Sequence, residues 1–584
     1  MNRIRSLLIF IVITAGNIPA HGQNVQITSF PQSYQLYPRD LQDSSIVDIS
    51  GNLRTPGYDS VKVWIEKDGQ YLGNLTEPLT YIQGIAEFDF QPKIHAELSN
   101  HSFQLFIDGN SIIVADSVVC GDTYIIQGQS NAEAYNLSNE RFGARWVRTF
   151  GNMSPNPIEC QNDTNWHMAI ATVWPEYEGH VGIWGLQMAK SIAVNYGIPV
   201  CIINGAKGGT TIAQHQKDEN NPRNLETIYG RLLYRMQESD IREHAKGIIW
   251  HQGENNTYPY NWSDYANQFD LLYNDWMVDY PGVVNVYIFQ IRHSFYDAAQ
   301  MHLRDVQRTI PYNYDNVKIM STLGIEAHDG LHFYWDGHFE MAERIYPLIA
   351  RDYYGSADTL NIAPPNILNV SYTSPASDTI AMEFDQEVFW PEDYQGYTME
   401  DHIYLDLSWG FIRRGGVSPA NPNTVILALS EPVEARYLTY TPNQSWNNAT
   451  PTQTYEGPLI KNDRGIDALT FYRFPIESYE DRCLRMSTQS TTTWDNPDPE
   501  FRISSSPNPF NPTTTVSYQL SAVSFVNLYV YDITGRKVAE LVRGWRDTGV
   551  HEVTFEASDL SSGVYLYRLT AGEFTDTGKM VLMK

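Results

Sequence analysis

The stretch "TYIIQGQSNAEAYN", residues 123–136, begins as an apolar strand and continues into a possible helix. The small and polar residues of "GQSN" mark a tight turn between the two parts. Ser130 stands at the tip of this turn, where two interpretations compete. Serine is a common helix cap. A serine at a strand-to-helix turn is also exposed, with backbone N–H groups directed at whatever lies above it.

Strand and helix patterns alternate on both sides of this turn, over residues 118–358. Apolar strands are predicted at residues 123–127, 198–205, 246–252, 283–291 and 317–323. Helical spacing of apolar residues predicts helices at residues 184–197, 223–239, 298–310 and 339–355. Such alternation with continuously apolar strands favours a parallel sheet covered by helices on both faces.

The remainder of the chain is predicted to be all-β, because short alternating strands are separated by turn residues. We expect β-sandwich domains at residues 23–117, 359–479 and 505–584, with a polar linker at residues 480–504. Residues 1–22 read as a signal peptide, in which Arg3 and Arg5 precede a short apolar run. That run is shorter than the roughly 20 residues of a membrane span, and no other segment is long enough.

The composition argues against a nucleic-acid partner, because 40 basic and 68 acidic residues give a net charge of −28. Four cysteines occur, and an oxidising compartment permits a disulfide bond among the first three. Their spacing does not suit a cysteine zinc site. The four are Cys120, Cys160, Cys201 and Cys483.

Polar or glycine-rich segments follow four of the predicted strands. They are "GQSN" (128–131), "GAKGGTTI" (205–212), "HQGEN" (251–255) and "GIEAHDGLHF" (324–333). Because ligands bind at the carboxyl ends of the strands in an open parallel sheet, we expect these four loops to converge on one rim.

Ser130, Asp329 and His332 on one rim suggest nucleophilic acyl transfer. We expect Ser130 to attack, His332 to take its proton and Asp329 to orient the imidazole. The two residues of the Asp-x-x-His pair can meet if their loop curls. Gly208 and Gly209 let a backbone N–H approach the substrate closely, and with the Ser130 N–H they could hold an oxyanion.

Taken singly, each motif has a plainer explanation. An isolated Asp-x-x-His pair is more often a surface ion pair, and "GAKGGT" is no phosphate loop because no Lys-Ser or Lys-Thr follows. Four further histidines are expected to be structural or on the surface: His180, His215, His293 and His338. The ordered placement of all four motifs at successive strand ends favours the catalytic interpretation.

At these residues the sequence resembles the SGNH hydrolases, particularly the branch of sialate O-acetylesterases and acetylxylan esterases. The segments "GQSNAEA", "GAKGGTTI", "WHQGENN" and "DGLHF" are similar to four blocks of that branch, in order, over about residues 120–350. The resemblance implies a flavodoxin-like three-layer α/β/α core with a parallel sheet. It also implies a triad of Ser130, Asp329 and His332, with Gly208 or Gly209 as an oxyanion donor.

The third block departs from the broad superfamily, where an asparagine donates to the oxyanion. Gln252, Asn255 and Asn256 compete for that role here, and we favour Gln252. Glu254 is expected to support its loop rather than act as a base. The aromatic residues of the loop around residues 156–180 are candidates for stacking on a sugar, with core packing as the equal alternative. The expected substrate contacts are Gln129, Asn131, Glu254, Trp166, Trp174 and Tyr177.

The C-terminal segment resembles the sorting domain of the type IX secretion system. Three segments of this chain are similar to the recurrent stretches of that sorting domain. They are "SPNPFNPTTTVSYQL" (506–520), "VYDITGRKVAEL" (530–541) and "SSGVYLYRL" (561–569). The resemblance implies export by that secretion machinery, followed by surface attachment or release.

The sequence thus predicts a secreted serine esterase that removes O-acetyl groups from carbohydrates through an acetyl-serine intermediate, without a metal or cofactor. One alternative is a non-catalytic carbohydrate-binding protein on a hydrolase scaffold. A second is a metal-dependent hydrolase using His251, Glu254, Asp329 and His332. Other ester substrates remain open within the same fold, and the sequence does not select the glycan.

Overall fold

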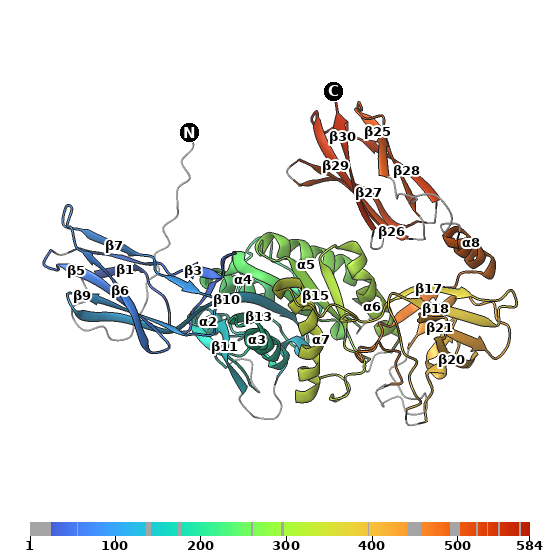
Figure 1. Ribbon diagram of the computed structural model, residues 1–584, viewed down its shortest axis with the longest axis horizontal. Coiled ribbons are helices and arrows are strands. Elements are labelled where there is room, and N and C mark those ends of the chain that lie inside the picture. The colour runs from blue at the N-terminus through green and yellow to red at the C-terminus, as the bar shows by residue number, and fades with distance from the viewer. Residues whose placement is uncertain are drawn as a thin grey trace. The chain divides into compact units, whose positions relative to one another are not determined.

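The computed structural model describes residues 25–584 except residues 55, 136–141, 173–176, 258–260, 294–296, 395, 442–456, 491–502, 521–523, 534, 547–548 and 572–573. The signal peptide predicted at residues 1–22 lies outside the described residues. The chain is multidomain (Figure 1), and it divides into two units. The first holds the residues up to Gln252, Asp270–Val284 and Ala327–Asp358, and the second holds Gly253–Phe269, Asn285–Glu326 and Thr359–Lys584.

The N-terminal part of the first unit is built of strands whose side chains alternate between core and solvent. In β7, for example, Ala86, Phe88 and Phe90 are buried while Glu87 and Asp89 are exposed. One sheet has the order β1 (Val25–Ser29), β4 (Ile49–Leu53), β7 (Ala86–Phe90). The second pairs β6 (Gln70–Pro78), β5 (Ser60–Lys67), β9 (His101–Ile107) and β10 (Asn110–Gly128). Short strands β2 (Leu36–Pro38), β3 (Ser44–Ile46) and β8 (Lys93–His95) complete this part.

Strand β10 continues from this β-domain into the α/β domain. Its first half pairs antiparallel with β9, and its second half pairs parallel with β13 (Val200–Asn204) and β14 (Ala245–His251). The predicted boundary between residues 117 and 118 therefore falls inside a strand. A register shift between Ala115 and Val118, with Ser117 at φ 58°, marks the change of partners.

The α/β sheet of the first unit has the order β12-β11-β13-β10-β14. β11 (Phe142–Phe150) pairs parallel with β13, whereas the edge strand β12 (Trp166–Ala171) is antiparallel to β11. The first unit's sheet is therefore mixed at this edge. All five residues of β13 are buried, as the continuous apolar run predicts.

The helices of this domain follow the predicted apolar spacing. Helix α3 (Ile183–Tyr196) ends at Gly197, whose left-handed conformation provides the C-cap, and α3 packs against α7 (Trp335–Tyr354). The Thr227 hydroxyl accepts the Gly230 N–H at the start of α4. The remaining helices are α1 (Ser130–Glu133), α2 (Pro157–Asn162), α4 (Ile228–Glu238) and α5 (Tyr265–Asp279).

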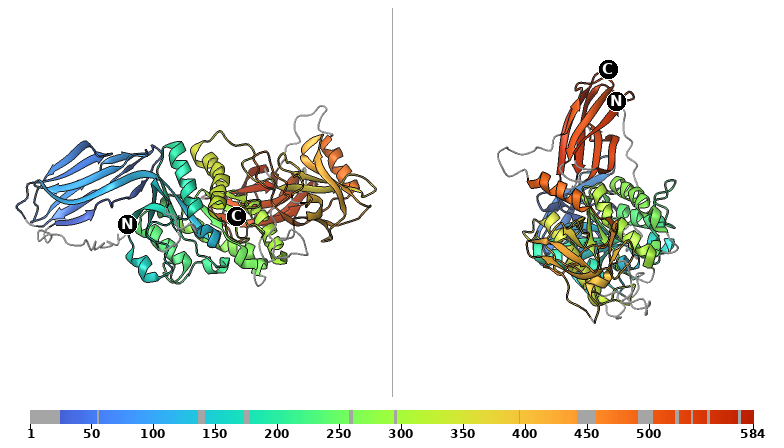
Figure 2. Two further views of the ribbon diagram at one scale, coloured as in Figure 1. Left: turned by 90° about the horizontal axis from the view of Figure 1, so that it is seen from below. Right: turned by 90° about the vertical axis from the view of Figure 1, so that its right-hand side faces the viewer.

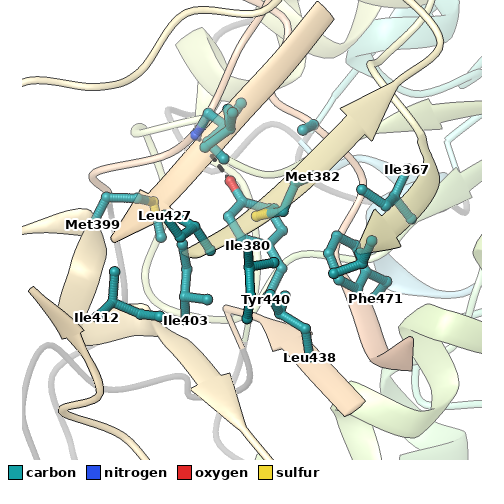
Figure 3. Close-up of a cluster of buried hydrophobic side chains, with 14 of the residues drawn as sticks. Ile367, Ile380, Met382, Met399, Ile403, Ile412, Leu427, Leu438, Tyr440 and Phe471 are labelled. Carbon is teal, nitrogen blue, oxygen red and sulfur yellow. Dashed lines mark hydrogen bonds between the residues drawn. The ribbon is translucent and has the colours of Figure 1, made fainter. Parts of the chain in front are cut away.

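In the second unit, β15 (Asn285–Gln290) pairs parallel with β16 (Val317–Ser321), and α6 (Asp297–Thr309) connects them. Two sheets follow in the chain. Their orders are β17 (Ile367–Tyr372), β18 (Thr379–Phe384), β21 (Asn421–Leu429), β20 (Ile412–Ser418), and β19 (Ile403–Leu405), β22 (Tyr437–Tyr440), β23 (Phe471–Pro475). Figure 3 shows their shared core, in which Ile380, Leu427 and Leu438 are fully buried. The buried Tyr440 hydroxyl accepts the Ile460 N–H.

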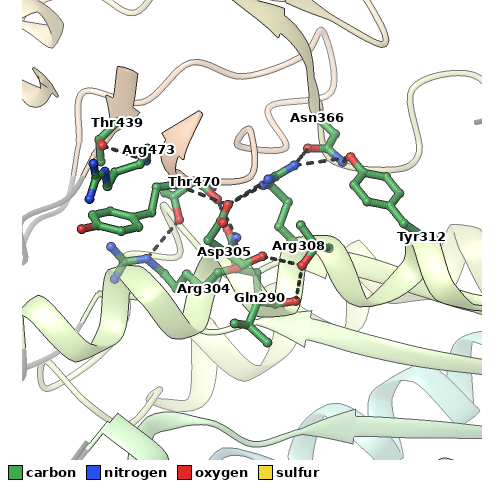
Figure 4. Close-up of polar contacts among 12 residues, drawn as sticks. Gln290, Arg304, Asp305, Arg308, Tyr312, Asn366, Thr439, Thr470 and Arg473 are labelled. Carbon is green, nitrogen blue, oxygen red and sulfur yellow. Dashed lines mark hydrogen bonds and ion pairs between the residues drawn. The ribbon is translucent and has the colours of Figure 1, made fainter. Parts of the chain in front are cut away.

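Polar side chains of β15 and α6 bind the segment that leads into β23 (Figure 4). Arg304 Nε donates to Thr470 Oγ1 over 3.0 Å, and Gln290 Nε2 donates to the Thr470 carbonyl over 2.9 Å. Arg308 forms an ion pair with Asp305 at 2.8 Å on the same helix. Because Gln290, Arg304 and Thr470 are buried, these bonds replace the water that the polar groups lose on folding.

The first part of the predicted linker at residues 480–504 is helical, because α8 spans Tyr479–Ser490, and residues 491–502 lie outside the described residues. Arg485 holds this helix through ion pairs with Glu383 at 3.2 Å and Glu477 at 3.1 Å. The linker was predicted from the low apolar content, without considering that ion pairs could hold a helix in this segment.

The C-terminal domain consists of two sheets around an apolar core that includes Val516, Leu528 and Leu569 (Figure 2, red). The sheets have the orders β24 (Ile503–Ser506), β25 (Thr513–Leu520), β28 (Gly549–Glu556), and β27 (Lys537–Arg546), β26 (Ser524–Asp532), β29 (Gly563–Ala571), β30 (Phe574–Leu582).

The four cysteines are free, so the disulfide bond expected among the first three is absent from these described residues. Cys120, Cys160 and Cys201 are each buried, and burial raises the pKa of the Cys120 and Cys201 thiols to about 12. Over the described part of the chain, no helix is both long and apolar enough to cross a membrane.

Candidate active site

Three of the four polar loops meet at the carboxyl ends of β10, β13 and β14 in the first unit. The Gln129 N–H donates to the carbonyl of His251, at the end of β14, over 2.9 Å. The Lys207 N–H, in the loop after β13, donates to the Gly128 carbonyl over 2.9 Å. Gly128 lies so close to β14 that a Cβ there would be 2.0 Å from the His251 oxygen. The parallel pairing and this contact explain the convergence that the sequence predicts.

Ser130 is the first residue of the single-turn helix α1, and Gln129 occupies the N-cap position. The serine hydroxyl is therefore not the cap of this helix, which was the plainer of the two interpretations. The first N–H groups of a helix lack intrahelical partners and point outward from its N-terminal end. Ser130 is half-buried, and its own N–H is one of these groups at the N-terminal end of α1.

The loop between β16 and α7 curls so that Asp329 and His332 face each other. Asp329 Oδ2 lies 3.5 Å from His332 Nδ1, and both side chains are about 40% exposed. The backbone N–H groups of Leu331 and His332 donate to Asp329 Oδ1 over 2.8 and 2.7 Å. Burial opposes ionisation of Asp329, but these donors and the imidazole outweigh it and lower the carboxyl pKa. Asp329 is therefore ionised at neutral pH.

This loop packs on the residue that follows Ser130. Asn131 Nδ2 donates to the Leu331 carbonyl over 3.1 Å, and the Phe333 N–H donates to Asn131 Oδ1 over 3.3 Å. Over the described residues no hydrogen bond joins Ser130 to His332 itself. Catalytic hydrogen bonds are often long in ligand-free enzymes and shorten when substrate binds.

The glycine loop after β13 lies on another side of Ser130. A Cβ at Gly208 would be 3.5 Å from Ser130 Cβ and 2.6 Å from Glu133 Oε2, so only glycine fits without a shift. The Gly208 N–H donates to the buried Glu133 carboxylate, as does the Tyr135 hydroxyl. Burial raises the pKa of Glu133, although these donors and Lys207 Nζ, 3.5 Å from Oε1, favour its ionised form.

Gln252 connects the serine loop with the glycine loop. It is fully buried, and its Nε2 donates to Gln129 Oε1 over 3.2 Å and to the Thr210 carbonyl over 3.1 Å. An amide nitrogen carries two hydrogens. Donation from Gln252 to an oxyanion therefore requires one of these bonds to be exchanged.

A buried polar network supports the glycine loop from below. Thr210 Oγ1 lies 2.8 Å from His215 Nε2, and Gln127 Nε2 lies 3.4 Å from His215 Nδ1. The Trp276 indole donates to Gln127 Oε1 over 2.9 Å. Burial lowers the pKa of His215 to about 3, so the imidazole stays neutral and can both donate and accept.

The other predicted substrate contacts lie in different environments. Trp166 is 4% exposed and packs edge-on against Phe150, which matches the core-packing alternative. Tyr177 is 58% exposed, and Trp174 lies outside the described residues. In the second unit, Glu254 is buried and Asn255 is half-buried at the start of a short 3₁₀-helix, Glu254–Thr257.

The four histidines expected to be structural or on the surface are all buried. They are His180, His215, His293 and His338. Nowhere in the described part of the chain do three or more His, Cys, Asp or Glu side chains gather in a geometry suited to a metal ion.

Sequence reasoning missed Glu133, which lies one helical turn after Ser130. A carboxylate three residues after a turn serine resembles an ordinary capping box, and that similarity conceals its contact with the glycine loop. His180 Nε2 lies 3.2 Å from the Glu133 carbonyl, and its Nδ1 accepts the Thr172 N–H over 3.2 Å. Burial lowers the pKa of His180 to about 4. No spacing rule connects these residues, because they come from separate loops.

Solved structures with a similar fold include a carbohydrate acetylesterase from Xanthomonas citri. It is 16% identical to this chain, the match covers 75% of this chain and 97% of that one, and the TM-score is 0.52. A protein from Arabidopsis thaliana and NanS each match 40% of this chain over 99% of their own length. Their identities are 16% and 13%, and their TM-scores are 0.32 and 0.30. No curated protein shows significant similarity to the chain.

Two segments match known families. Residues 120–350 match the family described as carbohydrate esterase, sialic acid-specific acetylesterase. Residues 506–583 match the secretion system C-terminal sorting domain, which indicates export to the cell surface or beyond it. Both resemblances noted in the sequence are thereby confirmed. The chain thus carries a carbohydrate-esterase domain of the sialic acid-specific acetylesterase family, followed by a C-terminal sorting domain for secretion.

Proposed function

We propose that this protein removes O-acetyl groups from carbohydrates by serine catalysis, as a sialate O-acetylesterase or acetylxylan esterase does. We also propose a flavodoxin-like three-layer arrangement for the catalytic domain, supported by the parallel pairing of β10 with β13 and β14. The observation that carries the catalytic proposal is the packing of the Asp329–His332 loop on Asn131, the residue covalently next to Ser130.

In the first half of the reaction, Ser130 Oγ attacks the acetyl carbonyl carbon while His332 takes the hydroxyl proton. The ionised Asp329 stabilises the imidazolium that forms. The oxyanion is held by the Ser130 N–H, by a donor from Gly209 or from Gly208 once its N–H leaves Glu133, and by the Gln252 amide. Collapse of the tetrahedral intermediate breaks the ester bond, and the departing sugar oxygen takes the proton from the imidazolium.

In the second half, water attacks the acetyl-serine carbonyl while the neutral imidazole of His332 takes a proton from the water. The second tetrahedral intermediate expels the Ser130 oxygen, which recovers the proton, and acetate leaves. The balance is one ester and one water consumed, and one acetate and one sugar hydroxyl formed. Each oxyanion donor removed from such a site costs about 2.7–4 kcal/mol of transition-state stabilisation.

The test is release of p-nitrophenol from p-nitrophenyl acetate by the full chain, together with acetate release from a panel of acetylated polysaccharides. Ser130→Ala should abolish turnover. Ser191→Ala, at a half-buried serine in the middle of α3, should leave it unchanged. A serine-directed phosphonate should label wild type but not Ser130→Ala. Equal turnover by wild type and Ser130→Ala would remove the proposal, and sugar binding without hydrolysis would favour the non-catalytic alternative.

A further inference from the structure

The Asn131 side chain holds the backbone on both sides of His332. Its Nδ2 donates to the carbonyl of Leu331, the residue before the histidine, over 3.1 Å. Its Oδ1 accepts the N–H of Phe333, the residue after it, over 3.3 Å. The two bonds join segments that are 200 and 202 positions apart in sequence.

Asn131 is itself fixed in place. It is 1% exposed, and the indole of the fully buried Trp184 donates to its backbone carbonyl over 2.8 Å. Phe333 is fixed on the other side, where its ring packs edge-on against the rings of His251 at 6.4 Å and His338 at 6.0 Å. The bonds between Asn131 and the loop therefore connect two buried, well-packed segments. Because Asn131 follows Ser130 directly, they limit how far the imidazole can lie from the serine.

The contacts within the histidine loop do not involve Asn131. Asp329 Oδ1 accepts the N–H groups of Leu331 and His332, and the Asp329 N–H donates to the His332 carbonyl over 3.0 Å. Loss of the Asn131 side chain should therefore leave the Asp329–His332 pair intact. It should change only the position of that pair relative to Ser130.

We infer that Asn131 is a positioning residue that sets the imidazole of His332 against Ser130, rather than the substrate contact that the sequence suggested. This inference rests on the proposed function. Both amide atoms of the side chain face the loop, and the side chain is buried away from solvent. A displacement of about 1 Å between a nucleophile and its base can cost about 100-fold in rate.

The experiment compares Asn131→Ala and Asn131→Leu with wild type on p-nitrophenyl acetate. Leu keeps the branched shape of the side chain, at a somewhat larger volume, and removes both bonds, so it separates loss of positioning from loss of packing. We expect kcat to fall about 100-fold in both variants, with KM within about threefold of wild type. The midpoint of the acid limb of kcat/KM should not move, whereas Asp329→Asn should shift it.

Asn204→Ala is the matched control. Asn204 is fully buried, and its side chain donates to the carbonyls of Ala132 and Val181 over 2.9 and 3.0 Å and accepts the Ala206 N–H over 2.9 Å. It has no bond to the histidine loop among these contacts. We expect this variant to lose at least as much Tm as Asn131→Ala and to keep kcat within about tenfold of wild type.

Three results would overturn the inference: a folded Asn131 variant with kcat within fivefold of wild type, the same kcat loss in Asn204→Ala at equal Tm, or a shifted acid limb. Loss of the native near-UV spectrum in both Asn131 variants would also overturn it, since the residue would then serve folding alone. Wild type that turns over no faster than Ser130→Ala would instead count against the proposed function. The His332 ring NMR signal would then test the positioning role of Asn131, since an unchanged signal in Asn131→Ala would contradict that role.

Discussion

Replacing Gly208 by alanine should disturb the proposed catalytic centre by a predictable amount. The added Cβ would lie 2.6 Å from Glu133 Oε2, whereas contacts of a Cβ below 3.0 Å essentially never occur. Glu133 or the glycine loop must therefore move by at least about 0.4 Å. Glu133 cannot swing away freely, because it is 1% exposed and is held by Tyr135 and Lys207.

The expected result is a fall in kcat of roughly tenfold to 100-fold, because sub-ångström to 1 Å displacements have effects of this size. This corresponds to about 1.4–2.7 kcal/mol of activation free energy. The assay is p-nitrophenyl acetate turnover, with a thermal melt on the same sample. Gly197→Ala is the control: its φ is +71°, nothing lies within 4 Å of the added Cβ, and it caps α3 away from the site. It should lose about 1–2 kcal/mol of stability and no kcat.

A double variant sharpens the test. If the steric contact with Glu133 is the cause, Gly208→Ala should add little to the effect of Glu133→Ala, because the atom it would meet is already gone. Residues in contact are expected to be non-additive in this way. Fully additive losses, or a Gly208→Ala enzyme with kcat within twofold of wild type, would refute the reasoning.

The remaining predictions concern charge. Asp122→Asn should lower the free energy of unfolding by about 3–5 kcal/mol in urea, because the buried carboxylate pairs with Arg39 at 2.8 Å and with a lysine on β14. Asp43→Asn, which breaks the exposed ion pair of Arg39, should cost less than about 1 kcal/mol. The lowered pKa of Asp329 stabilises the fold above about pH 4, so the Tm difference between wild type and Asp329→Asn should vanish at lower pH.

Local signals predicted much of the α/β domain. The left-handed Gly197 ends α3 as expected, and the apolar run before residue 205 is a fully buried strand. The predicted boundary between residues 117 and 118 coincides with the register shift at which β10 changes partners, but the sequence did not show that one continuous strand crosses it. The edge strand β12 was read as a loop, since its Trp166 fits a binding surface and a core equally well until its neighbours are known.

The functional motifs were predictable because each is local, whereas the contacts that align them are not. Asp329 and His332 lie within four residues, so the sequence alone indicated that they could meet if their loop curls, and they do lie face to face. The sequence suggests a substrate contact for Asn131 and a helix cap for Glu133. Only the fold shows that Asn131 faces the histidine loop and that Glu133 faces the glycine loop. The proposed chemistry is therefore indicated by the local motifs, whereas the alignment of those motifs depends on buried polar side chains next to Ser130, the proposed nucleophile. Substitutions at those side chains should alter the rate without changing which group attacks, which bond breaks or which ester is cleaved.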